Sequence, residues 1–294
     1  MYKILDLAFL NNQDTIAAFV VETSVGPVLI ESGPHSTFDS LTKGLKSIGY
    51  EVEDIKHVLL SHIHFDHAGA AWCFANNGAT IYVHPFGAKH IASPEKLYNS
   101  AKMIYGDKME YLWGQMHPIS EAQIYAPTHG EALTIGDKTF TAWHTPGHAS
   151  HHIAWQMDDV LFAGDVAGVK IKGGVVVPPC PPPDINVEDW QASILLMKSL
   201  KINELVLTHF GSMTDVEAHL DALETMLLAW ANWIKPHYEA GRKPADIIPE
   251  FELYVADLLK ANGVSEQDIP KYASANPAFM SVAGLMRYWH KKLS

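Results

Sequence analysis

The sequence predicts an α/β protein with a helical C-terminal region, and three observations support this. Short β-favouring apolar runs alternate with helical periodicities over residues 1–212. No strand pattern appears from Thr214 onward, where long amphipathic stretches begin. The chain has 294 residues, 48% of them hydrophobic, which is enough to bury a sizeable core. We therefore divide it into an α/β domain, 1–212, and an all-helical C-terminal extension, 213–294.

Local patterns place the elements of the first domain in chain order. Apolar runs bounded by turn residues predict strands. The predicted strands are 16–21, 27–30, 56–61, 80–83, 132–135, 139–144, 152–157, 160–163 and 204–208. Helices are predicted from Ser36 to Gly49, at 68–75 and, capped by Asn186, at 187–200. The prolines of 173–183 exclude helix and central strand, so this segment is predicted to be a rigid loop.

Two regions depart from this alternation. Residues 86–120 are rich in aromatic residues and methionine, and Pro94 marks a helix start. We expect a helical insert there, either a lid or a segment that packs its own small core. In the extension, a capping box at Thr214–Glu217 predicts a long helix reaching about Glu239. Two or three further helices should follow, separated by glycines and prolines.

Composition excludes several classes of protein. The chain carries 33 acidic and 21 basic residues, a net charge of −12, which argues against a general nucleic-acid binder. Its apolar runs are too short to span a bilayer, and Asp6 interrupts any signal-peptide pattern, so we expect a cytoplasmic protein. Its two cysteines cannot build a disulfide framework.

Histidine, by contrast, is abundant, with 17 residues and no terminal run. The most informative stretch is Ser61–His67 (SHIHFDH), between a predicted buried strand and a short helix. His62 and His64 alternate and should point the same way, whereas Asp66 and His67 project around the turn. Such a cluster suits two metal ions better than one, and three histidines and an aspartate within six residues are hard to explain as surface or capping groups.

This stretch resembles the H-x-H-x-D-H signature of the metallo-β-lactamase-fold superfamily. Three later motifs strengthen the resemblance: Thr145-Pro146-Gly147-His148, Phe162-Ala163-Gly164-Asp165 and Leu207-Thr208-His209-Phe210-Gly211. Their order and spacing are similar to those of the glyoxalase-II-like branch. The resemblance implies a four-layer αβ/βα sandwich. It also implies a ligand set, with His62, His64 and His148 on one metal, Asp66, His67 and His209 on the other, and Asp165 bridging both.

Two divalent ions, with zinc as the default and iron or manganese also tolerated, fit this donor set. Ions that share a water would generate a bridging hydroxide as nucleophile, which Asp66 could orient as the catalytic side chain. Glu31 stands where the family usually has an aspartate that orients a ligand histidine, and we expect the same role of it. His152 and His84 are expected close to the site, and the role of His151 is left open. The other histidines are expected at surface or capping positions: His35, His57, His90, His117, His129, His144, His219, His237 and His290.

The substrate is less well defined by sequence. The aromatic insert suits an apolar acyl or aryl group, with Tyr105, Tyr111 and Trp113 as substrate contacts. This favours hydrolysis of an activated carboxyl ester, a thioester or a lactone, on a small-molecule substrate. The alternatives are a phosphodiesterase or nuclease on the same metals, a non-hydrolytic di-iron redox protein, and a binding protein that has lost turnover. The terminal helices could form a homodimer contact or brace the groove.

Overall fold

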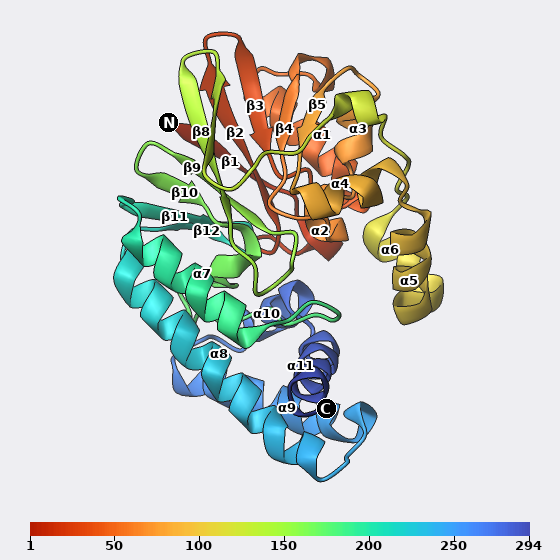
Figure 1. Ribbon diagram of the computed structural model, residues 1–294, viewed down its shortest axis with the longest axis vertical. Coiled ribbons are helices and arrows are strands. Elements are labelled where there is room, and N and C mark those ends of the chain that lie inside the picture. The colour runs from red at the N-terminus through yellow and green to blue at the C-terminus, as the bar shows by residue number, and fades with distance from the viewer.

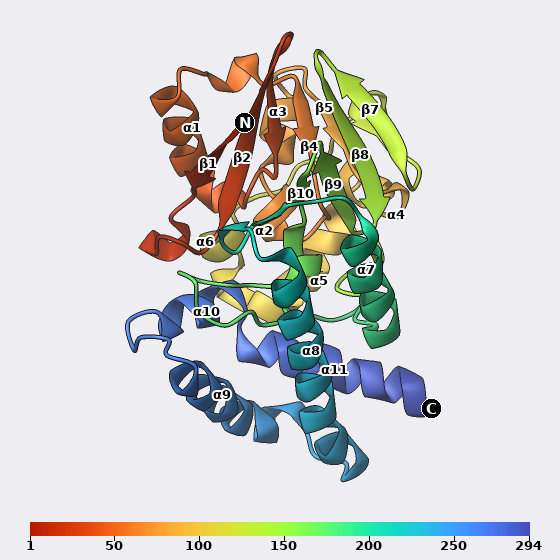
Figure 2. The ribbon, with the colours of Figure 1, turned by 90° about the vertical axis from the view of Figure 1, so that its left-hand side faces the viewer.

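The computed structural model describes all 294 residues and contains two six-stranded sheets that pack face to face (Figures 1 and 2). The strands of the first sheet, in order, are β1 (Tyr2–Asp6), β2 (Ala17–Thr23), β3 (Gly26–Ile30), β4 (His57–Leu59), β5 (Thr80–Tyr82) and β6 (Ile124–Tyr125). Those of the second are β12 (Gly211–Met213), β11 (Glu204–Leu207), β10 (Val160–Phe162), β9 (Ile153–Met157), β8 (Lys138–His144) and β7 (Glu131–Ile135).

Strand β2 shows how the layers form. Its alternate residues Ala17, Phe19 and Val21 lie in the core between the two sheets, together with buried aromatic residues of the second sheet. Ala18 and Val20 point the other way, into the core beneath the helices of the first sheet. Because successive side chains of a strand point to opposite faces, a strand that is apolar at every position must be covered on both sides.

Helices provide that cover on the outer face of each sheet. On the first sheet they are α1 (Phe38–Ser47), α2 (Phe65–Ala68) and α3 (Ala71–Ala75); on the second the principal one is α7 (Val187–Ser199). Asn186 caps α7 as predicted, since its side chain accepts a hydrogen bond from the Asp189 N–H. The result is the expected sandwich of helices, sheet, sheet and helices.

The insert is helical, with α4 (Pro85–Ala92), α5 (Glu95–Tyr105) and α6 (Met109–Trp113), and α5 follows Pro94 as predicted. Helices α5 and α6 project from one side of the sandwich (Figure 1). The insert is joined to the first domain by aromatic contacts, because the Trp113 ring stacks on Phe9 at 5.3 Å and lies 6.3 Å from Phe65.

The C-terminal extension consists of α8 (Val216–Glu239), α9 (Pro244–Ala261), α10 (Ile269–Ala275) and α11 (Ala278–Leu293), which lie beyond one end of the sandwich (Figures 1 and 2). A core of 31 buried residues joins these helices to α7 and to the outer face of the second sheet. None of the helices combines the length and apolar character needed to cross a membrane. The division near residue 212 stays a prediction.

Several local predictions were wrong for identifiable reasons. The Thr214–Glu217 capping box does not form, because α8 begins at Val216 without a side-chain cap. Helix α9 continues through Pro249, whose lost hydrogen bond is offset by the complete burial of Ile247 and Phe251. Ser36 does not cap α1 but donates a hydrogen bond to the Leu112 carbonyl of the insert.

Some boundaries of helices and strands also differ from the predicted ones. The segment 68–75 forms parts of two short helices rather than one, and β3 begins at Gly26, one residue before the predicted strand 27–30. Strands β6 and β12, of two and three residues, were not among the predicted strands.

Candidate metal centre

The predicted ligands lie in loops and short helical turns that follow strands of both sheets, at the end of the sandwich facing the C-terminal helices (Figure 1). The 61–67 loop follows β4, His148 follows β8, Asp165 follows β10 and His209 follows β11. Because these strands end at the same edge, four separate segments of the chain meet there. Four of the seven predicted ligands lie in the 61–67 loop, and the other three follow strands of the second sheet. The site therefore depends on correct packing of both sheets.

The 61–67 loop divides its own side chains between two positions. His62 and His64 lie in the extended segment before α2, whereas Asp66 and His67 lie in the first turn of that helix. The change from extended to helical backbone separates His64 from Asp66, but the His67 ring still lies 4.0 Å from that of His62. His62 also forms a group with His67 and Asp165, so the division of these side chains between two ions stays a prediction.

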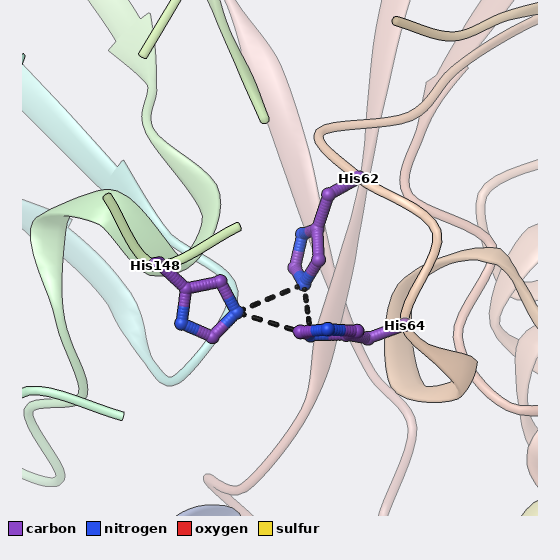
Figure 3. A group of neighbouring side chains, drawn as sticks. All are labelled: His62, His64 and His148. Carbon is purple, nitrogen blue, oxygen red and sulfur yellow. Dashed lines mark hydrogen bonds between the residues drawn. The ribbon is translucent and has the colours of Figure 1, made fainter. Parts of the chain in front are cut away.

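The first group consists of His62, His64 and His148, whose ring nitrogens converge (Figure 3). His62 Nε2 lies 2.8 Å from His64 Nδ1, and His148 Nε2 lies 3.2 Å and 3.0 Å from these two atoms. Figure 3 shows His148 reaching the other two rings from a separate loop. Three imidazole nitrogens pointing at one place form a donor set for a transition metal.

The second group consists of Asp66, His67 and His209. Asp66 Oδ2 lies 3.6 Å from His67 Nε2 and 3.5 Å from His209 Nε2. Asp165 lies between the groups: its Oδ1 is 3.3 Å from both His67 Nε2 and His209 Nε2, and its Oδ2 is 3.3 Å from His148 Nε2. The two oxygens of one carboxylate thus face different groups.

Some buried polar atoms of this cluster have no hydrogen-bond partner within the protein. His67 Nε2, His209 Nε2 and Asp165 Oδ1 are buried and have no hydrogen-bond partner. Burying such atoms unpaired costs free energy, and native proteins rarely do so without a compensating ligand. A cation bound by these three atoms would remove the penalty, so the residues present fit a metal ion.

The outward-facing nitrogens of four of the five predicted ligand histidines have partners. Ser61 Oγ lies 2.9 Å from His62 Nδ1, and Glu31 Oε1 lies 3.1 Å from His67 Nδ1. The Nδ1–H of His148 and of His209 donates to a backbone carbonyl, that of Pro179 at 2.8 Å and of Thr15 at 2.6 Å respectively. Such partners set the tautomer and orientation of a metal-binding imidazole.

Glu31 reaches His67 despite being one methylene longer than the aspartate usual in the family. Its backbone adopts a left-handed conformation, with φ +63°, immediately after β3. Its second oxygen, Oε2, accepts the Ser61 N–H at 3.2 Å. The carboxylate, 1% exposed, therefore holds both the loop backbone and a predicted ligand.

The electrostatics of the two groups differ. Burial and the neighbouring imidazoles lower the pKa of His62 well below its usual value. Burial acts in the same direction on His67, but the carboxylates of Asp165, Asp66 and Glu31 outweigh it and raise the pKa of His67 well above its usual value. Burial alone would raise the pKa of Asp66, but His67 and His209 lower it to about 2. The second position therefore attracts positive charge strongly.

Of the other predicted histidines, two lie beside the cluster and one does not. The His152 ring is 5.2 Å from that of His62, and Thr145 Oγ1 lies 2.8 Å from its Nδ1. The His151 ring lies 5.7 Å from that of His64, and its Nε2 faces Asp184 at 3.9 Å.

The expectation for His84 needs correction. Its Nδ1 caps α4 by accepting the Phe86 N–H, and its ring contacts are with Phe86 and His144 rather than with any predicted ligand. Its position after β5 suggested the site, but the turn into α4 directs the ring elsewhere.

The three predicted substrate contacts have different environments. Tyr105 lies on the inner side of the insert, 5.4 Å from Trp113 and 6.3 Å from Phe279 of α11 by ring centroids. Burial and the nearby Asp66 carboxylate raise the pKa of its hydroxyl. Trp113 packs into the first domain, and Tyr111 is 68% exposed. Of the three, Tyr105 has the environment best suited to a substrate contact.

Sequence reasoning missed the residues that orient the ligands. The carbonyls of Pro179 and Thr15 are backbone groups, which carry no residue-type signal. His219 was expected at a surface or capping position, but it is 4% exposed and its Nε2–H donates to the Ala167 carbonyl, two residues from Asp165. Its place on the apolar face of α8 was the one available signal.

Comparison with known proteins agrees with this geometry. A family model described as the metallo-beta-lactamase superfamily matches residues 12–209. The metallo-beta-lactamase fold-containing protein ST1585 of Sulfurisphaera tokodaii is 28% identical over 176 residues, 58% of this chain and 66% of that protein. An N-acyl homoserine lactonase of Bacillus thuringiensis is 33% identical over 184 residues, 52% of this chain and 64% of the lactonase. The chain thus spans less than two thirds of the length of these curated relatives.

Among solved structures, the metallo-beta-lactamase family protein TTHA1429 of Thermus thermophilus superposes with a TM-score of 0.70 at 20% identity. The alignment covers 99% of this chain and 93% of that protein, and so includes the C-terminal helices. At this identity the likeness concerns the fold alone. The family model matches most of both sheets, and the fold and the converging histidines and aspartates agree with that match. The chain therefore belongs to the metallo-beta-lactamase superfamily.

Proposed function

We propose that this protein is a dinuclear metal-dependent hydrolase of activated carboxyl esters, with a lactone or thioester as substrate. The observation that carries the proposal is the position of Asp165. Its two carboxylate oxygens each lie 3.3 Å from histidines of different groups. A carboxylate whose two oxygens face different groups is expected of a ligand shared by two neighbouring cations.

In this proposal His62, His64 and His148 hold one ion, Asp66, His67 and His209 hold the other, and Asp165 binds both. Imidazole nitrogens and carboxylate oxygens suit zinc, and four protein ligands per ion leave a fifth position for water or substrate. The same donors also accept iron and manganese. Zinc is proposed because hydrolysis needs no change of redox state.

When bound, the ions would lower the pKa of a water molecule, which makes it a nucleophile at neutral pH, and would polarise the scissile carbonyl. The chain contributes orientation. Asp66 is 18% exposed by its side chain, so it borders the space that substrate must enter. With a pKa lowered to about 2 it is ionised at neutral pH, and it can accept a hydrogen bond from the attacking water. This makes positioning, rather than proton storage, its main contribution.

The surroundings favour an apolar substrate. The rings of Tyr105 of the insert and Phe279 of α11 lie 6.3 Å apart, and Tyr105 is near enough to Asp66 for its carboxylate to raise the pKa of the hydroxyl, so both added segments contribute aromatic rings on this side of the molecule. The net charge of −12 disfavours long polyanions such as nucleic acids. The lactonase relative supports a small carboxyl ester as the bond cleaved. A cytoplasmic location and a homodimer remain predictions from the sequence.

The test combines metal analysis with a substrate panel. Protein purified without added metal should hold close to two transition ions per chain, and it should hydrolyse N-acyl homoserine lactones or acyl thioesters faster than bis-p-nitrophenyl phosphate. Selective cleavage of the phosphodiester would favour a phosphodiesterase, and visible charge-transfer bands with no hydrolysis would favour a di-iron redox protein. Protein that reproducibly binds no metal would remove the proposal.

A further inference from the structure

The orientation of His148 depends on a loop that has little regular structure of its own. Its Nδ1–H donates to the carbonyl of Pro179, which leaves Nε2 free to face His62 and His64. Pro179 lies within Val177–Pro183, where five of seven residues are proline and lack an N–H. Val177 pairs with Val169 in a β-bridge, but the prolines after it lack the N–H that a strand or helix needs, so other parts of the chain must hold the rest of the loop in place.

The holding contacts come from the C-terminal extension and flank Pro179 on both sides. Asn276, at the end of α10, donates its Nδ2–H to the Pro178 carbonyl at 3.0 Å. The Cys180 N–H donates to Ser281 Oγ of α11 at 3.3 Å. Ser281 Oγ in turn donates to Asn276 Oδ1 at 2.9 Å, which joins the two contacts into one network.

Gly284 shows how closely α11 approaches this loop. A Cβ at this helical position would lie 2.0 Å from the Cys180 carbonyl oxygen, so no larger residue fits without moving the backbone. Ser281, one turn earlier on the same face, is fully buried. Helix α11 is therefore packed directly on the segment that bears the Pro179 carbonyl.

Two further contacts link the extension to other ligands. Lys271 Nζ of α10 lies 3.0 Å from Asp14 Oδ2, and the next residue, Thr15, provides the carbonyl that accepts the His209 Nδ1–H. His219 of α8 bonds to Ala167, in the short helix that contains Asp165. Each of the three ligands outside the 61–67 loop thus has a backbone neighbour held by the extension.

We propose that the C-terminal extension is a positioning element of the metal centre, and that Asn276 and Ser281 act through the Pro179 carbonyl to orient His148. This inference rests on the proposed function, since it assumes that the first group binds an ion. It predicts that the affinity and coordination geometry of that ion depend on Asn276 and Ser281. These lie 98 and 101 residues further along the chain than Pro178 and Cys180, the loop residues that they contact.

The chain offers a closely matched pair of substitutions as a test. Asn276→Asp keeps the size of the side chain and the acceptor for Ser281, but it replaces the donor to Pro178 with an oxygen that repels the carbonyl. Asn262→Asp makes the same change at the end of α9, where the amide donates to Leu258 far from the site. Ser281→Ala and Ser274→Ala form a second pair, since Ser274 bonds only to Pro270.

Both pairs are measured by cobalt titration in competition with a chromophoric chelator, by the visible spectrum of the cobalt protein, and by thermal unfolding of the metal-free protein. Asn276→Asp should lower the binding affinity of one of the two cobalt ions about tenfold. This is the lower end of the effect of removing a group that orients a metal ligand. The substitution should also alter the spectrum of that ion, and Ser281→Ala should do likewise. Asn262→Asp and Ser274→Ala should leave both unchanged.

The outcomes separate the two proposals. If the unaltered protein binds no cobalt, the proposed function fails and this inference fails with it. If the unaltered protein binds two ions but Asn276→Asp matches Asn262→Asp in affinity and spectrum, the positioning role alone is wrong. A lower melting temperature of Asn276→Asp with unchanged cobalt binding also overturns it, because it shows that the contact is merely structural.

Discussion

The two halves of the candidate metal centre, residues 61–67 and the separate ligands His148, Asp165 and His209, are held in different ways. In the first half the partners are side chains: Ser61 bonds to His62, and Glu31 bonds to His67. In the second half the histidine partners are backbone carbonyls in loops that the C-terminal helices hold. The first half is a local product of one strand–loop–helix unit, whereas the second requires nearly the whole chain.

Removing the one predicted ligand that faces both groups should have the largest effect. Asp165→Ala eliminates the carboxylate that faces both groups, so we expect metal content to fall well below two ions per chain. Activity should fall more than about 100-fold, since loss even of an outer partner costs about 10- to 100-fold. Metal analysis and initial rates provide the measurement. Asp184→Ala serves as the control, because Asp184 faces His151 and Ser150 rather than a predicted ligand.

Glu31 tests the side-chain partners of the first half. Glu31→Gln keeps the length of the side chain but removes the charge beside His67 Nδ1. The second ion should bind about tenfold to 100-fold more weakly, while the ion held by His62 keeps its affinity. Stepwise cobalt titration distinguishes the two ions. Equal weakening of both would show that Glu31 supports the fold of the loop rather than one ligand.

The pH dependence of stability should distinguish the metal-free from the loaded protein. Although burial opposes it, the Asp165 and Asp66 carboxylates raise the pKa of His209 to about 10 from 6.5. A raised folded-state pKa contributes stability that is fully present below the unfolded value and lost as pH rises through the folded one. The metal-free protein should therefore lose stability between about pH 6.5 and 10.

A bound ion replaces that proton, so the loaded protein should show a smaller loss over the same range. Melting temperatures with and without zinc across this range measure the difference, and His209→Gln should reduce the pH dependence specific to the metal-free form, to which His67 also contributes. A metal-free melting temperature that is flat or rises with pH would contradict the assignment of positive charge to this position.

The smallest effects are expected where the insert meets the extension. Tyr105→Ala removes an aromatic wall close to Asp66, which should raise KM about fivefold to tenfold for an apolar acyl substrate, equivalent to about 1 to 1.5 kcal/mol of lost contact. Tyr111→Ala should change KM less than about twofold, because this ring is 68% exposed. Steady-state kinetics on the best lactone or thioester make the comparison, and equal effects would assign the insert a purely structural role.

The same contrast explains what the sequence could predict. The 61–67 cluster is contiguous, so the residue types and their alternation indicated both the site and its division into two positions. His148, Asp165 and His209 were identified by short motifs that resemble those of a family, because their convergence depends on the registry of two sheets. The layers followed from apolar strands such as β2, which need cover on both faces.

What could not be predicted is tertiary and largely carried by backbone. Thr15 and Pro179 act through carbonyls that every residue possesses, so nothing in their side chains identifies them. His84 follows a strand of the first sheet, as the 61–67 loop does, but its side chain caps α4 instead of contacting a predicted ligand. Pro249 lies inside a helix because packing on both sides of it outweighs its local preference.

Anomalous diffraction from zinc-loaded crystals tests the central claim most directly. Two peaks should flank the Asp165 carboxylate, one about 2.0–2.2 Å from nitrogens of His62, His64 and His148, the other at the same distance from donors of Asp66, His67 and His209. A loaded crystal with no peak among these seven side chains, or with its zinc bound elsewhere on the protein, would contradict the account.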